Sequence, residues 1–309
     1  MEEKTRKLRS CTGTDVMKTA QDCFACFYSQ LNRTMKYAGM DGEQGRQIIR
    51  KAASIIERAS LDEVPARTST QMYRILVKEI GRDPYEQVKE TCNLRAIERF
   101  PSLRCMIREV PDRLEGAVRV AIAGNSIDFG VTDEIDIDES LSEAFRLSLE
   151  GYEHFAEELD MATRILYLCD NAGEILFDRV LIEFLKKQGK KVIAAVKGYP
   201  VINDATLHDA TVAGLHECAT IIDNGNDGVG TLLELCSSLF MHEYRNADLI
   251  ISKGQANYET LYQTRDSRIF FLFKIKCQAM ADFLNRRNKD IVLLNGGRSH
   301  APTNLPGPA

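Results

Sequence analysis

The second half of the sequence alternates short apolar runs with segments of helical periodicity, and this alternation restricts the possible folds severely. Strands separated by helices of this length favour parallel pairing, because a parallel crossover needs a long connection. The pattern therefore predicts an α/β fold with a doubly wound, mainly parallel sheet. The predicted strands span residues 165–169, 191–196, 220–223, 248–252, 269–273 and 290–294, and the predicted helices span 174–188, 204–216, 231–240 and 277–285.

The first half of the sequence is helical in character. Apolar side chains between residues 15 and 37 recur at the helical spacing of about 3.6 residues. Further helices are predicted at 43–59, 70–80, 84–99 and 141–159, with breaks at Pro65, Gly81 and Pro101. We therefore expect a helical region over 1–120, an α/β domain over 121–298 and a disordered, proline-containing tail over 299–309.

Composition narrows the classes of protein that the chain can belong to. The net charge of −5 and the scattered Lys and Arg residues argue against a nucleic-acid partner. No apolar run approaches the ~20 residues that span a bilayer, so no membrane contact is expected. The first residues lack an apolar signal region, which predicts a cytoplasmic protein. Nothing in the sequence indicates the oligomeric state.

The chain has nine cysteines, an odd number that argues against a disulfide framework. Cys23 and Cys26 form a CxxC on one face of the first predicted helix. They are either small buried residues or two ligands of a metal or iron-sulfur site. The second reading needs two more ligands, for which Cys92 and Cys105 are candidates at a spacing that matches no usual zinc pattern.

Polar side chains stand where several predicted strands end. Asp170 and Asn171 follow the first strand, Asp204 comes shortly after the second, and Lys253 and Asn257 follow the fourth. Because the carboxyl ends of parallel strands share one edge of the sheet, we expect these residues to meet in one crevice.

Two carboxylates and an amide oxygen leave positions open on Mg²⁺ or Mn²⁺, which water and a phosphate oxygen can fill. Lys253 and the backbone N–H of Gly254 are candidates to hold other phosphate oxygens. Glu174, at the start of a helix, is a candidate to transfer a proton or to orient a water. The residues thus predict metal-assisted phosphate chemistry.

Each of these residues also has a plainer interpretation. Asp204 and Asn171 suit helix N-caps, the Asp223–Gly225 sequence suits a turn, and Lys253 suits a solvated loop. Their shared location favours a site. Asp136 and Asp138 resemble a phosphatase DxD motif but follow no apolar strand, and the five histidines form no metal-binding pattern.

Four motifs occur in an order that resembles the damage-control phosphatase family, long known as domain of unknown function 89 and also described as acidic-residue-methyltransferase-like. They are GNSIDFG at 124–130, DNAGE at 170–174, KG at 197–198 with NDAT at 203–206, and SKGQAN at 252–257. DCFAC at 22–26 and DPY at 83–85 look like the family's microbial subfamily. The resemblance covers roughly residues 15–296.

The resemblance implies a helical N-terminal region packed on a Rossmann-like α/β domain, and a metal-dependent phosphatase that acts on small phosphorylated metabolites. It carries the family's metal ligands onto Asp170, Asn171 and Asp204, and the family's lysine onto Lys253. It also implies that Asn125 contacts substrate or phosphate, with Asp128 beside it.

We therefore predict a phosphomonoesterase that uses Mn²⁺, Mg²⁺, Co²⁺ or Ni²⁺ to hydrolyse sugar phosphates or damaged phosphometabolites. The alternatives are a non-catalytic binder of a phosphorylated ligand or nucleotide, and an adenosylmethionine-dependent carboxyl methyltransferase, although no glycine-rich adenosylmethionine loop follows the first strand. Water and a carboxylate both remain candidate nucleophiles. The predicted catalytic residues are Asp170, Asn171, Glu174, Asp204 and Lys253, and the predicted substrate-binding residues are Asn125, Asp128, Gly254 and Asn257.

Overall fold

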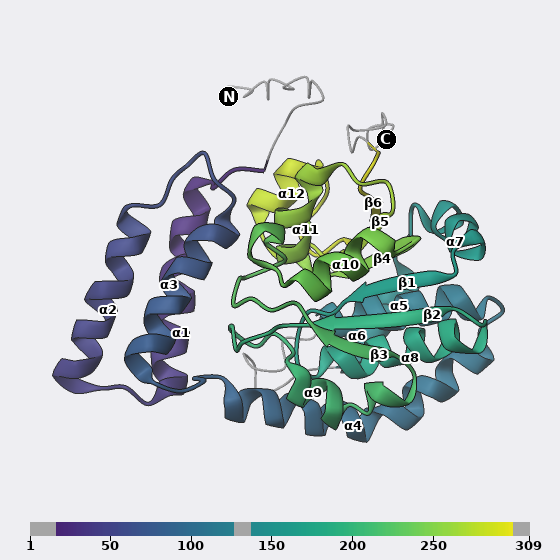
Figure 1. The fold of residues 1–309 in the computed structure, drawn as a ribbon, viewed down its shortest axis with the longest axis horizontal. Coiled ribbons are helices and arrows are strands. Elements are labelled where there is room, and N and C mark those ends of the chain that lie inside the picture. Colours follow the sequence, from purple (N-terminus) through teal and green to yellow (C-terminus); the bar gives the residue numbers. More distant parts are fainter. Residues whose placement is uncertain (1–16, 127–136, 299–309) are drawn as a thin grey trace, which may run out of the picture.

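The computed structural model describes residues 17–126 and 137–298, and within these ranges helices surround a single six-stranded sheet (Figure 1). The strands are β1 (Arg164–Leu168), β2 (Lys191–Val196), β3 (Thr220–Asp223), β4 (Leu249–Lys253), β5 (Ile269–Lys274) and β6 (Ile291–Asn295). The helices are α1 (Gln21–Ala38), α2 (Gly42–Glu57), α3 (Pro65–Ile80), α4 (Glu86–Glu109), α5 (Arg113–Ser126), α6 (Ile137–Arg146), α7 (Tyr152–Met161), α8 (Glu174–Lys187), α9 (Leu207–Val212), α10 (Ser238–Asn246), α11 (Gln255–Leu261) and α12 (Gln278–Leu284).

The sheet has the strand order β3-β2-β1-β4-β5-β6. All neighbouring pairs are parallel except β5 and β6, which are antiparallel. The chain winds outward from β1 through β2 to β3, then returns to the other side of β1 with β4. The order reverses between β1 and β4, which is where α/β sheets of this kind place their ligands. The predicted doubly wound, mainly parallel α/β fold is confirmed.

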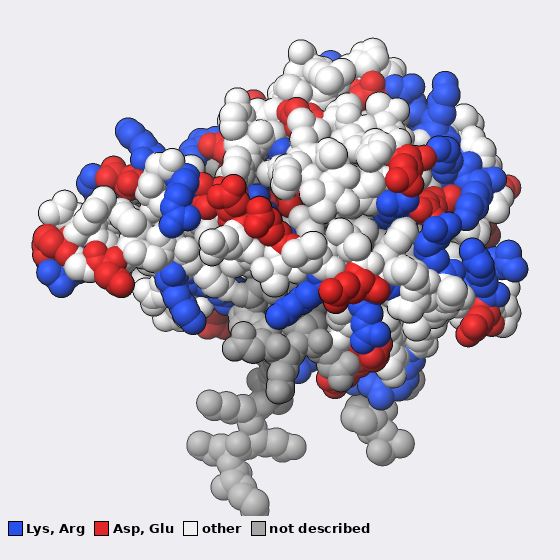
Figure 2. Space-filling model, turned by 90° about the horizontal axis from the view of Figure 1, so that it is seen from below, with Lys and Arg blue, Asp and Glu red and all other residues white. Residues whose placement is uncertain are grey.

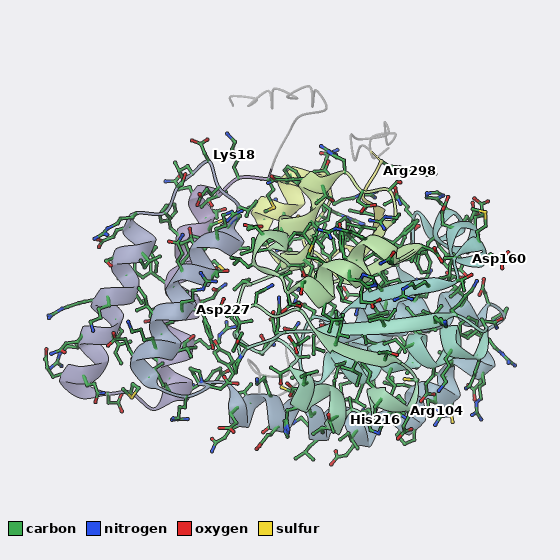
Figure 3. All side chains as sticks on the ribbon, in the orientation of Figure 1. Lys18, Arg104, Asp160, His216, Asp227 and Arg298 are labelled. Carbon is green, nitrogen blue, oxygen red and sulfur yellow. The ribbon has the colours of Figure 1, made fainter. Side chains whose placement is uncertain are left out.

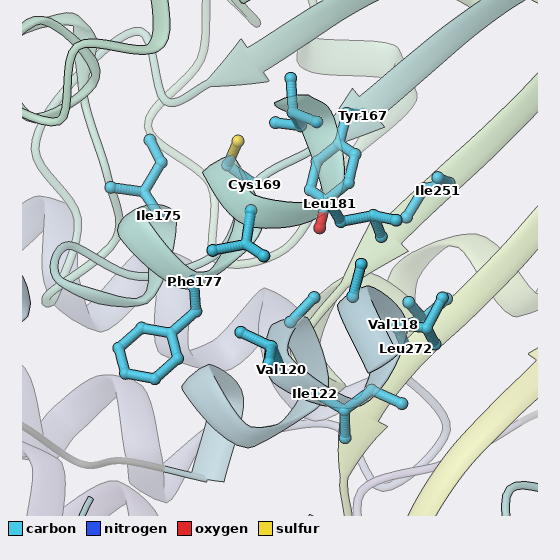
Figure 4. Close-up of a cluster of buried hydrophobic side chains, with 14 of the residues drawn as sticks. Val118, Val120, Ile122, Tyr167, Cys169, Ile175, Phe177, Leu181, Ile251 and Leu272 are labelled. Carbon is cyan, nitrogen blue, oxygen red and sulfur yellow. The ribbon is translucent and has the colours of Figure 1, made fainter. Parts of the chain in front are cut away.

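The strands bury both faces, because successive side chains point to opposite sides of the sheet. Ile165 and Tyr167 of β1 belong to a core with α4, α5 and α8, whereas Leu166 and Leu168 belong to a core with α10, α11 and α12. Figure 4 shows part of the first core, where side chains of α5 and α8 lie close to each other and to side chains of β1, β4 and β5. A helical layer therefore covers each face.

Helix α5 lies inside the molecule. Apart from the half-buried Arg119, its residues 116–125 are buried, which explains why the apolar run at 116–123 has no polar face. A Cβ at Gly124 would lie 2.7 Å from Cβ of Phe177, so glycine permits the close approach of α5 to α8. The boundary predicted at residue 120 falls within α5, and the division into domains stays a prediction.

Helices α1, α2 and α3 form a separate core beside the sheet (Figure 1). Val201 and Val229, from the loops after β2 and β3, also belong to it, so these loops at the carboxyl edge of the sheet meet the three helices. Asp227, labelled in Figure 3, accepts two hydrogen bonds from Nε of Arg74 and one from Nη2, at 2.6–3.0 Å. The helices therefore lie against the edge where ligands are expected.

Several predicted helix boundaries are wrong. Helix α4 continues through Pro101, because this residue is exposed and water can solvate the carbonyl that loses its amide partner. The segment 141–159 is two helices separated at Gly151, whose φ is +86°. Helix α9 begins only at Leu207, after a capping box formed by Thr206 and Asp209. The helix predicted at 231–240 is α10, which begins at Ser238, and α11 was not predicted.

None of the helices within the described ranges combines the length and the hydrophobicity needed to cross a membrane. The face drawn in Figure 2 carries both basic and acidic side chains, with Lys and Arg gathered toward one end.

Candidate active site

Backbone hydrogen bonds join the loop after β1 to the loop after β2. Asn171 and Asp204 form an isolated antiparallel bridge. The Ala205 N–H donates to the Asp170 carbonyl at 2.8 Å, and the Ala172 N–H donates to the Asn203 carbonyl at 2.9 Å. The structure therefore brings Asp170, Asn171 and Asp204 together at the carboxyl edge of the sheet. Asp204 is not a helix N-cap, because Thr206 caps α9.

The turn that presents Asp204 has an unusual backbone. Ile202 has φ +47°, a left-handed conformation that is unfavourable for a β-branched residue. The Asp204 N–H closes the turn by donating to the Val201 carbonyl at 3.0 Å. Strained backbone of this kind persists where surrounding structure imposes it, and it concentrates at functional sites.

Two carboxamides bridge two buried carboxylates. Nδ2 of Asn125 donates to Oδ2 of Asp170 at 2.9 Å and to both oxygens of Glu174, at 3.0 and 3.2 Å. Nδ2 of Asn171 donates to Oδ2 of Asp170 at 2.8 Å and to Oε2 of Glu174 at 2.9 Å. Asn125 also accepts from the Lys274 N–H at 3.1 Å, so its amide is held from both ends. Asp128, predicted beside Asn125, lies outside the described residues.

The site carries more negative than positive charge. Burial and the charges of Glu174 and Asp204 raise the pKa of Asp170 to about 8. Burial also raises the pKa of Asp204, although Nζ of Lys197, 3.3 Å from its Oδ2, acts in the opposite direction. For Asp170 and Asp204, burial therefore disfavours the ionised form. Burial acts on Glu174 in the same direction, but the charges of Lys253 and Lys276 and the hydrogen bonds together outweigh it and lower the pKa of Glu174.

Lys253 is fully buried, and its ammonium group is engaged within the protein. Nζ lies 2.5 Å from Oδ1 of Asp178, 2.7 Å from Oε1 of Glu174 and 2.9 Å from the Ala121 carbonyl. Burial opposes the charge of Lys253, but Asp178 and Glu174 outweigh this effect and raise its pKa. The sequence predicts that Lys253 holds phosphate, but the structure places its three donors on protein acceptors, where Lys253 supports Glu174.

Gly254 and Asn257 also differ from expectation. The Gly254 N–H donates to the Leu272 carbonyl at 3.1 Å, so it is not available to a phosphate. Asn257 is buried, donates to the Lys253 carbonyl at 2.8 Å and accepts from Oγ1 of Thr231 at 2.7 Å. Both residues shape the loop after β4, and a contact of Asn257 with substrate stays a prediction.

Lys276, just beyond the end of β5, was not among the predicted site residues. It is exposed, and its charge lowers the pKa of both Asp170 and Glu174. Lys276 follows the carboxyl end of β5 as Asp170 follows that of β1, so its position after a predicted strand is the sequence signal for it. Asn93 of α4 was also missed: it accepts from the Gly173 N–H at 2.8 Å and anchors the loop after β1, a contact with no sequence signal.

The donor set suits a hard divalent cation. Within the described ranges, no three His, Cys, Asp or Glu side chains are placed to share an ion, so a ligand other than these is needed. Asn171 could supply one, because its nitrogen donates to the carboxylates and its Oδ1 takes no part in those hydrogen bonds. Four buried acids lie here with two buried lysines, and the ion pairs join three of the acids to these lysines while Asp170 forms an ion pair with neither. The acids are Asp170, Glu174, Asp178 and Asp204, and the lysines are Lys197 and Lys253.

Comparisons with known proteins point to one family. A model of the damage-control phosphatase ARMT1-like domain matches residues 19–292. A protein of Pyrococcus horikoshii named damage-control phosphatase is 36% identical over 272 residues, which cover 86% of this chain and 93% of that protein. One of the same name from Archaeoglobus fulgidus is 30% identical over 274 residues, covering 86% and 94%. A crystal structure of a domain-of-unknown-function-89 protein from P. horikoshii has a TM-score of 0.82 at 34% identity, covering 91% of this chain and 99% of that one.

Proposed function

The chain belongs to the damage-control phosphatase ARMT1-like family, and from this premise we propose that it is a divalent-metal-dependent phosphomonoesterase acting on small phosphorylated metabolites. The observation that carries the proposal is the convergence of Asp170, Asn171 and Asp204 at one edge of the sheet, where the buried carboxylate of Asp170 forms no ion pair with a described lysine. Sugar phosphates and damaged phosphometabolites are the proposed substrate class.

Asp170, Asn171 and Asp204 are the residues that would hold Mn²⁺, Mg²⁺, Co²⁺ or Ni²⁺. When bound, the cation would polarise the phosphoryl group and lower the pKa of a water. Lys276 is the proposed phosphate contact, because it is exposed and its charge acts on Asp170, whereas Lys197 and Lys253 are bound to protein acceptors. Glu174 keeps the carboxamides of Asn125 and Asn171 in place through its hydrogen bonds.

Water is the proposed nucleophile. Asp170 and Asp204 serve as ligands, while Glu174 is held by Lys253 and by two carboxamides. Asp178, the other acid of the cluster, is bound to Lys253 and to the hydroxyl of Tyr167. No described carboxylate of the cluster is thus left unengaged to attack phosphorus.

The first test replaces a proposed ligand. Asp170→Ala should abolish turnover of p-nitrophenyl phosphate with Mn²⁺, because it removes a charged ligand from the cation. Asp223→Ala is the matched control: Asp223 also ends a parallel strand, but its Oδ1 only accepts from the Gly225 N–H in a turn. Retained turnover by folded Asp170→Ala would reject Asp170 as a ligand. Adding EDTA to the unmodified protein should also stop phosphate release.

The second test addresses the phosphate contact. Lys276→Gln should raise KM about 10- to 100-fold, since a hydrogen bond to a charged group contributes about 1.5–3 kcal/mol. Lys187→Gln, an exposed lysine in the last turn of α8, should leave KM unchanged. Equal KM values for the two variants would remove Lys276 from the site.

A panel of sugar phosphates assayed for inorganic phosphate separates the enzyme from the alternatives. Binding without phosphate release in every metal would favour a non-catalytic binder. Stabilisation by adenosylmethionine in a thermal shift would favour a methyltransferase.

A further inference from the structure

We infer that Asp178 is a positioning residue for the metal site: through Lys253 and Glu174 it holds the carboxamide of Asn171 with its oxygen available to the cation. The inference rests on the proposed function. Asp178 stands outside the four motifs of the sequence, and its contacts only appear once the sheet and α8 are packed together.

Asp178 lies one helical turn after Glu174, on the same face of α8. Its side chain is fully buried, and its Oδ1 accepts from Nζ of Lys253 at 2.5 Å and from the hydroxyl of Tyr167 at 2.7 Å. Tyr167, from β1, is itself fully buried. Asp178 thus ties Lys253 of β4 to β1 and α8.

Lys253 lies between two carboxylates. Its Nζ is 2.7 Å from Oε1 of Glu174 and 2.5 Å from Oδ1 of Asp178, and the Ala121 carbonyl accepts its third hydrogen bond at 2.9 Å. An ammonium group has three donors, so these contacts fix its position completely. Without Asp178, one of the three anchors is lost and the contact with Glu174 is no longer fixed from the opposite side.

Glu174, held in place by Lys253, in turn orients Asn171, the proposed metal ligand. Its Oε2 accepts from Nδ2 of Asn171 at 2.9 Å, and Oδ2 of Asp170 accepts from the same nitrogen at 2.8 Å. If the amide flipped, Oδ1 of Asn171 would face two carboxylates instead of Nδ2 and would be repelled. Glu174 and Asp170 therefore select the orientation in which Oδ1 is available.

Asp178 keeps one oxygen without a partner. Oδ2 is buried and has no hydrogen bond. Leaving a buried acceptor unsatisfied is unfavourable for folding, which suggests that the residue is kept for something other than stability. Replacing a residue that hydrogen-bonds to a metal ligand, without touching the metal itself, typically changes metal affinity about 10- to 100-fold.

The test measures Mn²⁺ affinity by electron paramagnetic resonance on the full chain. Asp178→Asn should raise the Kd for Mn²⁺ at least about 10-fold. Tyr167→Phe removes only the hydroxyl that steadies Asp178, without changing any charge, and should raise the Kd several-fold. Asp248→Asn is the matched control, because Asp248 caps backbone N–H groups at the opposite edge of the sheet and should leave the Kd unchanged.

A second readout separates positioning from mere stabilisation. In Asp178→Asn the Mn²⁺ concentration needed for half-maximal turnover should rise, while kcat at saturating Mn²⁺ returns close to that of the unmodified protein. A purely structural role would lower the metal-free Tm and leave the Kd of the folded protein unchanged.

The outcomes are distinguishable. If the unmodified protein does not bind Mn²⁺, the proposed function fails. If the unmodified protein binds Mn²⁺ and both Asp178→Asn and Tyr167→Phe bind it with the same Kd, the inference about Asp178 fails while the proposed function stands. A higher Kd in Asp178→Asn but not in Tyr167→Phe would assign the effect to charge and overturn the positioning role. If Asp178→Asn does not fold, Tyr167→Phe decides.

Discussion

At the scale of single residues, the tightest constraint on the site is the absence of a side chain at Gly254. Its φ is +82°, and a Cβ there would lie 2.1–2.6 Å from the carboxylate atoms of Asp170. These atoms belong to a carboxylate that two carboxamides hold in place, so Asp170 cannot move aside without losing those bonds. Gly254 therefore makes room for the proposed metal ligand rather than for phosphate.

Gly254→Ala should abolish metal-dependent turnover, because the new methyl group displaces the Asp170 carboxylate. Gly39→Ala is a close control: Gly39 has φ +61°, yet nothing lies within 4 Å of its Cβ position. It should cost about 1 kcal/mol of stability and keep its activity. The measurements are phosphate release and the free energy of unfolding. Activity in Gly254→Ala similar to that in Gly39→Ala would contradict the steric argument.

At the scale of elements, the helix α11 was missed in the sequence although it positions two buried polar residues. It has only seven residues and follows β4 directly. Such a short helix has too few turns to show an apolar repeat. It places Asn257 behind Lys253, and it buries Glu259, whose Oε1 accepts from Nε2 of Gln255 at 3.0 Å.

Glu259 also acts on the CxxC motif of α1. Burial raises the pKa of Cys23 to about 11, and the charges of Glu259 and Cys277 add to this. The pKa of Cys26 is raised for the same reasons, although a hydrogen bond from Gln30 opposes the shift. The raised pKa values disfavour the thiolate form of both cysteines.

The packing of α11 predicts a pH dependence of stability. Burial raises the pKa of Glu259 from 4.5 to about 7, against the smaller effect of Gln255. Between these two pH values the folded chain holds a proton on Glu259 that the unfolded chain has released. The contribution of Glu259 to the free energy of unfolding is therefore fully present below about pH 4.5, and it is lost as the pH rises through about 7. Glu259→Gln should therefore be more stable than the unmodified protein at pH 8, by up to about 3 kcal/mol, and equal to it near pH 4.

The measurement is denaturant unfolding of both proteins across this pH range, with the difference taken at each pH. Glu90→Gln is a suitable comparison, because Glu90 is exposed on α4 and its surroundings change little on folding. A difference between Glu259→Gln and the unmodified protein that does not change with pH would show that Glu259 stays ionised in the folded chain.

At the scale of the whole molecule, the helices α1–α3 and the sheet are joined around the site. Arg74 and Arg67 of α3 pair with Asp227 and Glu234, which lie after β3, at 2.6 and 2.5 Å. Exposed ion pairs of this kind contribute little to stability. Val201 and Val229 pack into the helical core, and the burial of their apolar side chains contributes more to the attachment than these exposed ion pairs do. This arrangement places the helical region where it can shape the binding of substrate.

The sequence alone determined the sheet and the position of its polar edge. Strands are recognised by local apolar runs, and β2 and β3 have the predicted bounds. Because parallel strands share one carboxyl edge, Asp170, Asn171 and Asp204 could be placed together before the structure was known.

Only the tertiary structure decided what each polar side chain contacts. Lys253 contacts Glu174 and Asp178, which lie 79 and 75 residues away from it along the chain. Its contact with the Ala121 carbonyl spans 132 residues. Periodicity reports which face of an element is buried, but not which polar groups meet across two packed elements. For that reason the sequence could identify Lys253 as a site residue. Its contact with Glu174, and the contact of Asp178 with Lys253, depended on how α5, α8 and β4 pack.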